Sequence, residues 1–260
     1  MLEKSLYVKI GLVVLCALIA VTFVFRDATK FNNNADASRV ASFGDSLTSG
    51  TLPRTTANPC GRSDDSWGAV LSEKLKADHT NYACSGATIS DILLQMDALT
   101  DESIVFISLG ANDVQLLQNI ALCLTTDCDT PVTDFYVKVD ALRPALLQAL
   151  LKASGNSRQV VLSLYPEVSF ASNGAPICES LAGLKSDTMI GMLEYINESL
   201  RSVAASVGDS VVVTPLENFK EHGICWDDSW VYGFDSPMVF HPNTYGHAMI
   251  AEAAYSAYKS

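Results

Sequence analysis

From residue 39 onward, two kinds of apolar segment alternate along the chain. Short runs rich in β-branched residues, such as Ser103–Leu109, are typical of strands that are buried on both faces. Between them lie segments such as Trp67–Ala77, in which apolar residues recur at helical spacing. Strands that alternate with helices predict βαβ units, in which parallel strands share one sheet and helices cover both of its faces.

Five strands and five helical segments are predicted. The expected strands are Arg39–Phe43, Asn81–Cys84, Ser103–Leu109, Gln159–Leu164 and Val211–Val213. The expected helical segments are Trp67–Ala77, Ile89–Leu99, Val132–Lys152, Leu181–Val207 as one or two helices, and Tyr245–Tyr258. Pro144 is expected to kink or break the third of them. The predicted fold class is α/β: one three-layer α/β/α sandwich around a central, mostly parallel five-stranded sheet.

The N-terminal segment has a different pattern. Residues 10–25 are an unbroken, largely apolar run, slightly long for a signal-peptide core and slightly short for a membrane span. Ala35 and Ala37 flank a possible cleavage site. We therefore expect residues 1–30 to be a signal peptide or an N-terminal membrane anchor, 31–38 a polar tether, and 39–260 the folded domain. Either alternative exports that domain.

Composition excludes some partners. The chain of 260 residues carries a net charge of −12 and has no cluster of Lys or Arg. Nucleic acid is therefore not an expected partner, and contact with a membrane is expected only through the N-terminal segment.

Cysteine usage also indicates export. Cys16 lies in the apolar run, and the folded part contains six more: Cys60, Cys84, Cys123, Cys128, Cys178 and Cys225. No CxxC pair combines with histidines at zinc spacing, so neither a metal site nor a cofactor is expected. One interpretation is that all six cysteines are buried free thiols. Disulfides formed in an oxidising compartment fit the sequence better. The residues alone do not choose among the pairings.

Four residues with distinct chemistry lie in turns far apart in the chain. Ser46 follows the first expected strand in a Gly-Asp-Ser-Leu turn, and Gly86 follows the second in Cys-Ser-Gly-Ala. Asn112 follows the third, and His241 precedes the last helix in Phe-His-Pro-Asn. Each alone reads more simply as a helix cap, turn or loop residue. Together they supply a hydroxyl nucleophile, a backbone N–H at a glycine, an amide donor and an imidazole base, which serine acyl transfer needs.

These blocks, in this order over residues 40 to about 255, resemble the GDSL/SGNH hydrolase family with its flavodoxin-like fold. The resemblance implies that Ser46 is the nucleophile and that His241 is the general base and then the acid. It implies an oxyanion hole made of the Ser46 and Gly86 N–H groups and the Asn112 side chain. The cysteine layout resembles the secreted, three-disulfide, actinobacterial-type esterases and lipases. That likeness implies the disulfides Cys60–Cys84, Cys123–Cys128 and Cys178–Cys225.

One position departs from the family pattern. Most members have an aspartate three residues before the histidine to hold its tautomer, and here that residue is Met238. We expect the Met238 backbone carbonyl to accept the hydrogen of His241 Nδ1. The alternative is the carboxylate of Asp235, with Asp227 and Asp228 as more remote candidates.

The predicted function is an exported serine ester hydrolase that cleaves lipid or other acyl esters through an acyl-serine intermediate. Two alternatives stay open: a carbohydrate O-acetyl esterase, and a non-catalytic, membrane-tethered binding domain on the same fold. The expected protein is a monomer, secreted or held at the membrane by its N-terminal segment.

Overall fold

The structure is a computed structural model, and it describes residues 39–50, 52–100, 102–125, 129–167 and 184–260. The chain divides into two units, residues 1–36 and 37–260. The apolar run at 10–25 lies outside the described residues, so its assignment as a signal peptide or anchor stays a prediction. In the ranges that the structure describes, no helix combines the length and apolar character needed to cross a membrane.

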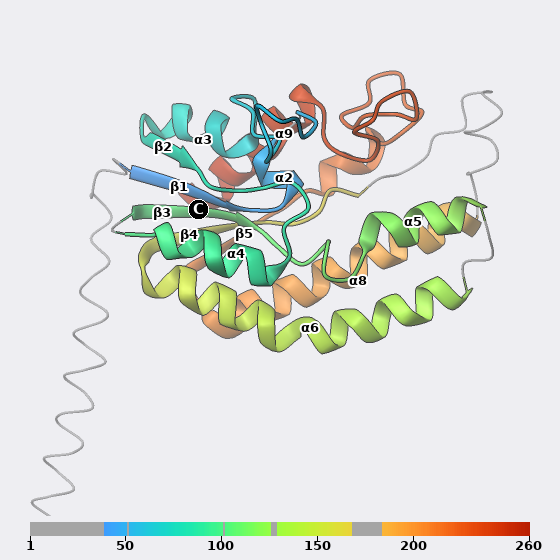
Figure 1. Ribbon diagram of the computed structural model, residues 1–260, viewed down its shortest axis with the longest axis horizontal. Coiled ribbons are helices and arrows are strands. Elements are labelled where there is room, and N and C mark those ends of the chain that lie inside the picture. Colours follow the sequence, from blue (N-terminus) through green and yellow to red (C-terminus); the bar gives the residue numbers. More distant parts are fainter. Residues whose placement is uncertain (1–38, 51, 101, 126–128, 168–183) are drawn as a thin grey trace, which may run out of the picture. The chain divides into compact units, whose positions relative to one another are not determined.

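A parallel sheet of five strands forms the centre of the domain, in the spatial order β2-β1-β3-β4-β5 (Figure 1). All four neighbouring pairs are parallel. The strands are β1 (Arg39–Gly44), β2 (Asp78–Asn81), β3 (Glu102–Ser108), β4 (Ser157–Ser163) and β5 (Val211–Thr214). The parallel sheet was expected from the strand-helix alternation, and it is confirmed.

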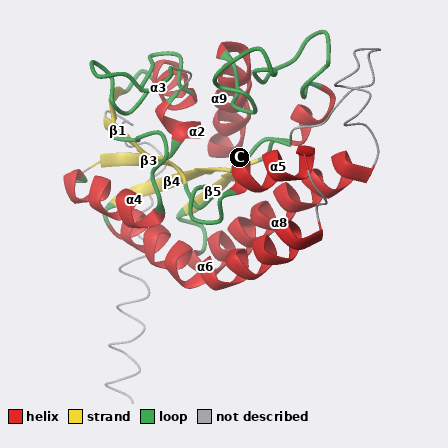
Figure 2. Cartoon of the chain, turned by 45° about the vertical axis from the view of Figure 1, so that its right-hand side comes forward, coloured by secondary structure: helices red, strands yellow, loops and turns green. Residues whose placement is uncertain are grey.

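Helices cover both faces of the sheet (Figures 1 and 2). On one face, α3 (Trp67–Leu75) packs against α9 (Thr244–Lys259). The other face is covered by α4 (Ile89–Gln95), α6 (Asp129–Gly155) and α8 (Leu184–Val207), and α5 (Leu116–Thr125) packs against α6 and α8. Three short elements complete the described chain: α2 (Ser46–Ser49), η1 (Met96–Ala98) and η2 (Glu217–Glu221). The three-layer α/β/α arrangement is therefore as predicted.

Apart from the three short elements, which were not predicted as separate elements, three elements differ from the sequence prediction. Strand β2 ends at Asn81, where the prediction began; beyond it Arg62 donates to the Tyr82 and Ala83 carbonyls, while the Tyr82 and Cys84 N–H groups still bond to β1. Helix α5 was not predicted, although its apolar residues recur at helical spacing. Pro144 lies inside α6, which continues past it, so the predicted break does not occur.

The strand order places the carboxyl ends of β1 and β3 side by side, with β2 beyond β1 and β4 beyond β3. Side chains of β1 and β3 such as Phe43, Val105 and Phe106 are fully buried between the helical layers. In open α/β sheets, ligands bind at the carboxyl edge where the strand order reverses. The turns after β1, β2 and β3 all lie at that edge, and they contain Ser46, Gly86 and Asn112.

Candidate active site

Ser46 is the first residue of α2, directly after β1. The turn depends on Gly44, whose φ of 138° is unfavourable for other residues and where a Cβ would lie 2.5 Å from the Ser108 carbonyl oxygen. Both main-chain groups of Gly44 bond to the Gln95 side chain, at 2.8 and 3.1 Å. The Asp45 carboxylate caps α2 by accepting the Leu47 N–H. These contacts fix the backbone on which the Ser46 hydroxyl stands.

His241 lies beside Ser46, although 195 residues separate the two in sequence. Its Nε2 is 2.8 Å from Ser46 Oγ. Its Nδ1 is 3.2 Å from the Val239 carbonyl oxygen. Because a carbonyl only accepts hydrogen bonds, this contact places the ring hydrogen on Nδ1 and leaves the Nε2 lone pair facing the serine. The geometry is that of a base ready to take the hydroxyl proton.

The group that orients His241 is not the one predicted. The Met238 carbonyl accepts the backbone N–H of His241 at 3.0 Å and closes a four-residue turn. Within this turn Phe240 has a φ of 70°, as the third residue of a type II turn requires. The imidazole ring therefore hydrogen-bonds to the carbonyl of Val239 instead of that of Met238.

None of the alternative carboxylates takes that place either. Asp235 is exposed, and no hydrogen bond joins it to His241 in the described structure. Asp228 lies 2.8 Å from Nδ1 of a different histidine, His222. Asp227 is exposed. Among the described residues, the imidazole thus pairs with a main-chain carbonyl and Ser46 alone.

The expected oxyanion donors lie at the same edge of the sheet. Gly86 has a φ of 86°, and its N–H, like that of Ser46, has no acceptor among the described residues. One amide N–H of Asn112 donates to the Ala87 carbonyl at 2.9 Å, which ties the third block to the second. An amide nitrogen has two hydrogens, so one remains for a ligand.

Tyr165 is a residue of this site that the sequence analysis missed. Its hydroxyl donates to Asp45 Oδ2 at 2.6 Å and accepts the Ala111 N–H at 3.0 Å. Burial raises its pKa well above the ordinary value, so it remains a donor at all working pH values. The Asn197 side chain holds the Tyr165 main chain by bonds to its N–H and carbonyl, at 2.9 and 2.8 Å. Tyr165 thus joins the Ser46 turn to the Asn112 turn.

The sequence contained one signal for Tyr165. It follows β4 by two residues, so it lies at the same carboxyl edge as the other site residues. A polar aromatic residue at this position of a parallel sheet is a reasonable candidate for a role in the site.

Two aspartates beside the site, Asp45 and Asp113, shape their turns. Asp45 is buried and also accepts from Ser108 Oγ at 2.7 Å. Asp113 accepts the Ile89 N–H at 3.0 Å at the start of α4. Burial raises the pKa of the Asp113 carboxyl, and the Ile89 hydrogen bond opposes this shift. Neither carboxylate is placed to act on a substrate at Ser46.

A narrow apolar cavity of about 50 Å³ adjoins Ser46 and His241. Its apolar wall is contributed mainly by α5, α8 and the segment before His241: Leu116, Leu117, Ile120, Leu193 and Phe240. Asn112 and Tyr165 also line it. The cavity offers an acyl group a dry environment directly beside the nucleophile.

One disulfide lies next to the site, between Cys60 and Cys84. This bond was implied by the family resemblance. Cys123 and Cys225 are disulfide-bonded as well. Cys128 and Cys178 lie outside the described residues, so the pairings Cys123–Cys128 and Cys178–Cys225 stay predictions. In the described part of the chain, no group of His, Cys, Asp and Glu side chains is arranged to hold a metal ion.

Comparison with known proteins gives a family for this chain. The sequence profile of the GDSL-like Lipase/Acylhydrolase family matches residues 42–249. No curated protein matches the chain in sequence.

Several solved structures share the fold. An extracellular lipase from Streptomyces rimosus superposes with a TM-score of 0.73 at 21% identity, covering 85% of this chain and 100% of the lipase. A phospholipase A1 from Streptomyces albidoflavus gives a TM-score of 0.71 at 23% identity, covering 86% and 100%. A variant of an acetyl-xylooligosaccharide esterase from Geobacillus gives 0.50 at 17% identity, covering 86% and 94%. At these identities the likeness shows the fold alone.

Proposed function

Because the chain belongs to the GDSL-like lipase/acylhydrolase family, we propose that it is an ester hydrolase that works through an acyl intermediate on Ser46. The single observation that carries this proposal is the 2.8 Å contact between Ser46 Oγ and His241 Nε2. That distance lies in the range in which a general base can take a proton directly.

In the first half of the reaction, Ser46 Oγ attacks the carbonyl carbon of the ester while its proton passes to His241 Nε2. The positive imidazolium keeps its Nδ1 hydrogen on the Val239 carbonyl. Negative charge on the former carbonyl oxygen is stabilised by the N–H groups of Ser46 and Gly86 and the free N–H of Asn112. Collapse of this intermediate expels the alcohol, which takes its proton from His241 and leaves the acyl group on Ser46.

In the second half, water replaces the alcohol. His241 takes a proton from the water molecule as it attacks the acyl carbon, and returns that proton to Ser46 Oγ when the acid leaves. Val239 supplies a neutral main-chain acceptor where other serine hydrolases use a carboxylate. The site therefore performs acyl transfer as a Ser-His dyad.

We propose that the enzyme acts outside the cytoplasm. The Cys60–Cys84 disulfide and the bonded states of Cys123 and Cys225 support an oxidising compartment. The apolar run at residues 10–25 supplies an export signal or an anchor in this proposal.

Substitution of the nucleophile tests the mechanism. Ser46→Ala is expected to lower kcat on p-nitrophenyl acetate by about 10³-fold or more, because the covalent intermediate can no longer form. Labelling with a fluorophosphonate probe should fail in the same variant, and mass spectrometry of the labelled parent should place the probe on Ser46. Thermal unfolding close to that of the parent is the control. Comparable turnover by a folded Ser46→Ala protein would refute the proposal.

A carbohydrate O-acetyl esterase is the second candidate, and the small volume of the apolar cavity favours it. About 50 Å³ accommodates a short acyl group better than a long chain. Comparison of kcat/KM for p-nitrophenyl acetate, butyrate and octanoate separates the two candidates. A steep fall with chain length supports the O-acetyl esterase, and a rise supports cleavage of lipid esters.

A further inference from the structure

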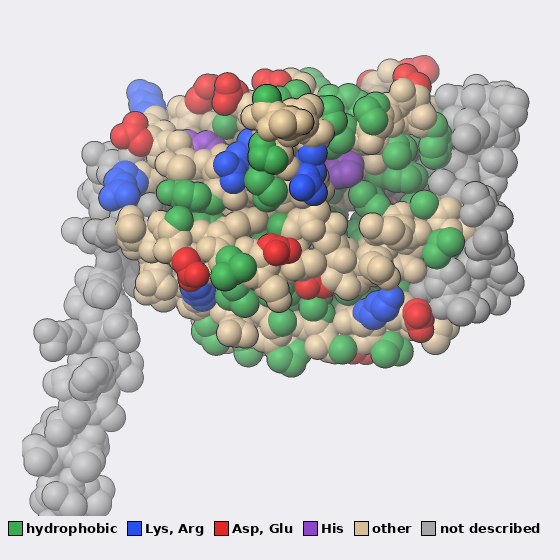
Figure 3. All heavy atoms as spheres, viewed as in Figure 1, with side chains coloured by type: hydrophobic (Ala, Val, Ile, Leu, Met, Phe, Trp, Pro, Cys, Tyr) green, Lys and Arg blue, Asp and Glu red, His purple; other side chains and the backbone are tan. Residues whose placement is uncertain are grey.

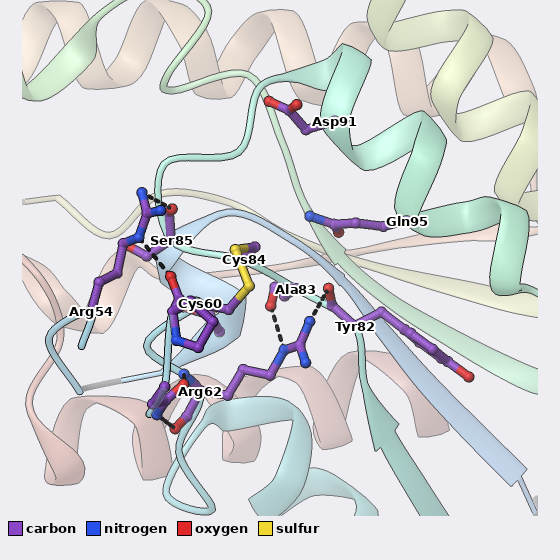
Figure 4. Close-up of a disulfide and its surroundings, with 12 residues drawn as sticks. Arg54, Cys60, Arg62, Tyr82, Ala83, Cys84, Ser85, Asp91 and Gln95 are labelled. Atoms are coloured by element: carbon purple, nitrogen blue, oxygen red, sulfur yellow. Dashed lines mark hydrogen bonds between the residues drawn. A yellow bond between two sulfur atoms is a disulfide. The ribbon is translucent and has the colours of Figure 1, made fainter. Parts of the chain in front are cut away.

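A second pocket, of about 510 Å³, is lined by Gly86 and by no residue that lines the apolar cavity. One wall is the segment around the Cys60–Cys84 disulfide, and the other is α4 with Asp91 and Gln95 (Figure 4). Arg54 and Arg62 line the first wall, one on each side of the disulfide. The proposed catalytic groups do not include either arginine.

The structure holds both guanidinium groups in place through neutral partners. Arg54 Nε donates to the Pro59 carbonyl at 2.6 Å, and its Nη1 donates to the Ser85 carbonyl at 3.4 Å. Arg62 bonds to the carbonyls of Ala83 and Tyr82, at 2.8 and 3.0 Å. Since a guanidinium has five N–H donors, each arginine retains donors for a ligand.

No carboxylate neutralises these two arginines. In the part of the chain that the structure describes, no Asp or Glu oxygen lies within 4.0 Å of either guanidinium. Asp91 is the one carboxylate that lines the pocket, and it bonds to the N–H and hydroxyl of Thr88. Two positive groups thus face a single negative one in a chain whose net charge is −12. On the face seen in Figure 3, basic side chains flank a hydrophobic patch near a histidine.

The position of Arg54 connects this pocket with the proposed reaction. A Cβ built on Gly86 would lie 3.6 Å from Arg54 Nη1, and apart from the two chain neighbours of Gly86 no other described residue comes within 4 Å of it. Gly86, whose N–H is one of the proposed oxyanion donors, therefore lies next to a charged guanidinium. This proximity is what links the arginine to an ester held at the proposed oxyanion donors.

We propose that Arg54, supported by Arg62, forms an anion subsite that selects esters carrying a phosphate or carboxylate group close to the scissile bond. Arginine suits this task because its planar donors match the oxygens of both anions. The proposal rests on the proposed function, since it names the substrate class of the same site.

The test uses two pairs of short-chain esters that differ in one charge. The phosphate pair is butyryl-glycerol 3-phosphate with butyryl-glycerol, and the carboxylate pair is acetylated methyl glucuronate with acetylated methyl glucoside. The quantity measured is the ratio of kcat/KM for the charged ester to that for the neutral ester. In the parent protein we expect a ratio above one for at least one pair, and the pair that shows it identifies the anion.

Arg54→Gln is expected to lower that ratio about tenfold or more, which is the size of one charge-assisted hydrogen bond. Arg54→Lys keeps the charge and should retain part of the preference. Arg143→Gln is the matched control, because Arg143 pairs with Asp140 on α6, and it should leave the ratio as in the parent. Added salt should lower the ratio in the parent, since exposed charges are screened.

Two outcomes overturn the subsite. One is a parent ratio at or below one for both pairs. The other is an equal loss on charged and neutral esters in Arg54→Gln, which would mean that the residue acts on every ester or only shapes the loop.

Failure of the proposed function has a different signature, which is a parent protein that hydrolyses none of the esters. Binding of glycerol 3-phosphate and of methyl glucuronate to the Ser46→Ala protein, measured by calorimetry, then decides the subsite. Binding of either anion that is lost on adding Arg54→Gln supports it, and no binding of either anion overturns it.

Discussion

At the scale of single residues, the site depends on a buried polar network that extends beyond the proposed catalytic groups. Asp45 accepts hydrogen bonds from Leu47 N–H, Ser108 Oγ and Tyr165 OH. Ser108 Oγ is also 2.7 Å from Thr48 Oγ1. Buried polar groups are costly when unpaired, so each member of this network stabilises the turn that carries Ser46.

Removal of the Tyr165 hydroxyl measures how much this network contributes to the free energy of unfolding. Tyr165→Phe leaves Asp45 Oδ2 and the Ala111 N–H without their partner, and the free energy of unfolding should fall by about 1–3 kcal/mol. Denaturant unfolding gives that value. We also expect a lower kcat with little change in KM, because the turns that carry Ser46 and Asn112 lose their link.

Tyr195→Phe is the matched control for this experiment. The Tyr195 hydroxyl bonds to the exposed Asp140, so its removal should change the free energy of unfolding by no more than about 0.5 kcal/mol. Equal effects of the two substitutions would contradict a special role for Tyr165.

At the scale of secondary-structure elements, the Cys60–Cys84 disulfide holds together the two segments that form the pocket wall next to Gly86. Cys60 and Cys84 are 24 residues apart, and their bond ties the loop that carries Arg54 to the segment that leads into Gly86. The Ser85 N–H donates to the Cys60 carbonyl at 3.0 Å, which fixes the same two segments together. This wall contains no regular helix or strand from 52 to 66, so it depends on such cross-links.

Replacement of both cysteines by serine tests this dependence. The free energy of unfolding should fall by about 2–4 kcal/mol, because the unfolded chain regains the freedom that the closed loop removes. We expect kcat/KM to fall as well, since Gly86 and Arg54 lose their fixed positions. Chemical denaturation and ester hydrolysis under identical conditions provide the two measurements. Unaltered stability and activity would show that the loop holds its shape without the bond.

Comparison of the predicted and observed elements shows which parts of the fold can be predicted from the sequence. Strand β3 was predicted because a buried parallel strand has a local signature of successive β-branched residues. Strand β2 was misplaced, and the carbonyls of the segment that was predicted instead bond to Arg62, which is 20 residues away from Tyr82 in sequence. No local pattern records a contact of that kind.

The site residues show the same contrast between features that have a local sequence signature and features that depend on contacts distant in sequence. Ser46, Gly86, Asn112 and His241 could be proposed from the sequence because each lies in a recognisable block, and the structure brings Ser46 and His241 together. The Val239 carbonyl was missed because the choice between adjacent carbonyls depends on the left-handed backbone of Phe240. Tyr165 was missed because its bond to Asp45 spans 120 residues.

At the scale of the whole molecule, one half-buried histidine, His79, and one fully buried histidine, His247, lie in the layer between the sheet and the helices α3 and α9. His79 Nε2 bonds to Ser42 Oγ at 2.7 Å, and His247 Nδ1 accepts the Trp67 N–H at 3.2 Å. Burial lowers the pKa of His79 to about 4, partly opposed by Asp64, and burial together with the nearby His241 lowers the pKa of His247 to about 3. Both are therefore neutral in the folded protein near neutral pH.

These two pKa values make the stability of the domain depend on pH. An unfolded histidine binds its proton near pH 6.5, whereas His79 and His247 bind theirs only near pH 4 and 3 when the chain is folded. The unfolded state thus holds more protons between these limits. The stability is complete above pH 6.5 and is lost as the pH falls, by up to about 1.4 kcal/mol per pH unit for each histidine.

Urea unfolding at several pH values between 6.5 and 5 checks this dependence. In His79→Gln, which can keep the bond to Ser42, we expect the contribution of one histidine to disappear and the slope to decrease by up to about 1.4 kcal/mol per pH unit. A slope equal to that of the parent would contradict the assignment of His79 as a neutral group in the folded protein.

The two bonds between Asn197 and the Tyr165 main chain have a consequence for producing the protein. Asn197-Glu198-Ser199 is an acceptor sequence for N-linked glycans. In the folded domain Asn197 is 8% exposed, and both polar atoms of its side-chain amide are hydrogen-bonded. A eukaryotic secretory host that attaches the sugar to the nascent chain would block this packing, whereas a bacterial host without that modification leaves the chain free to fold.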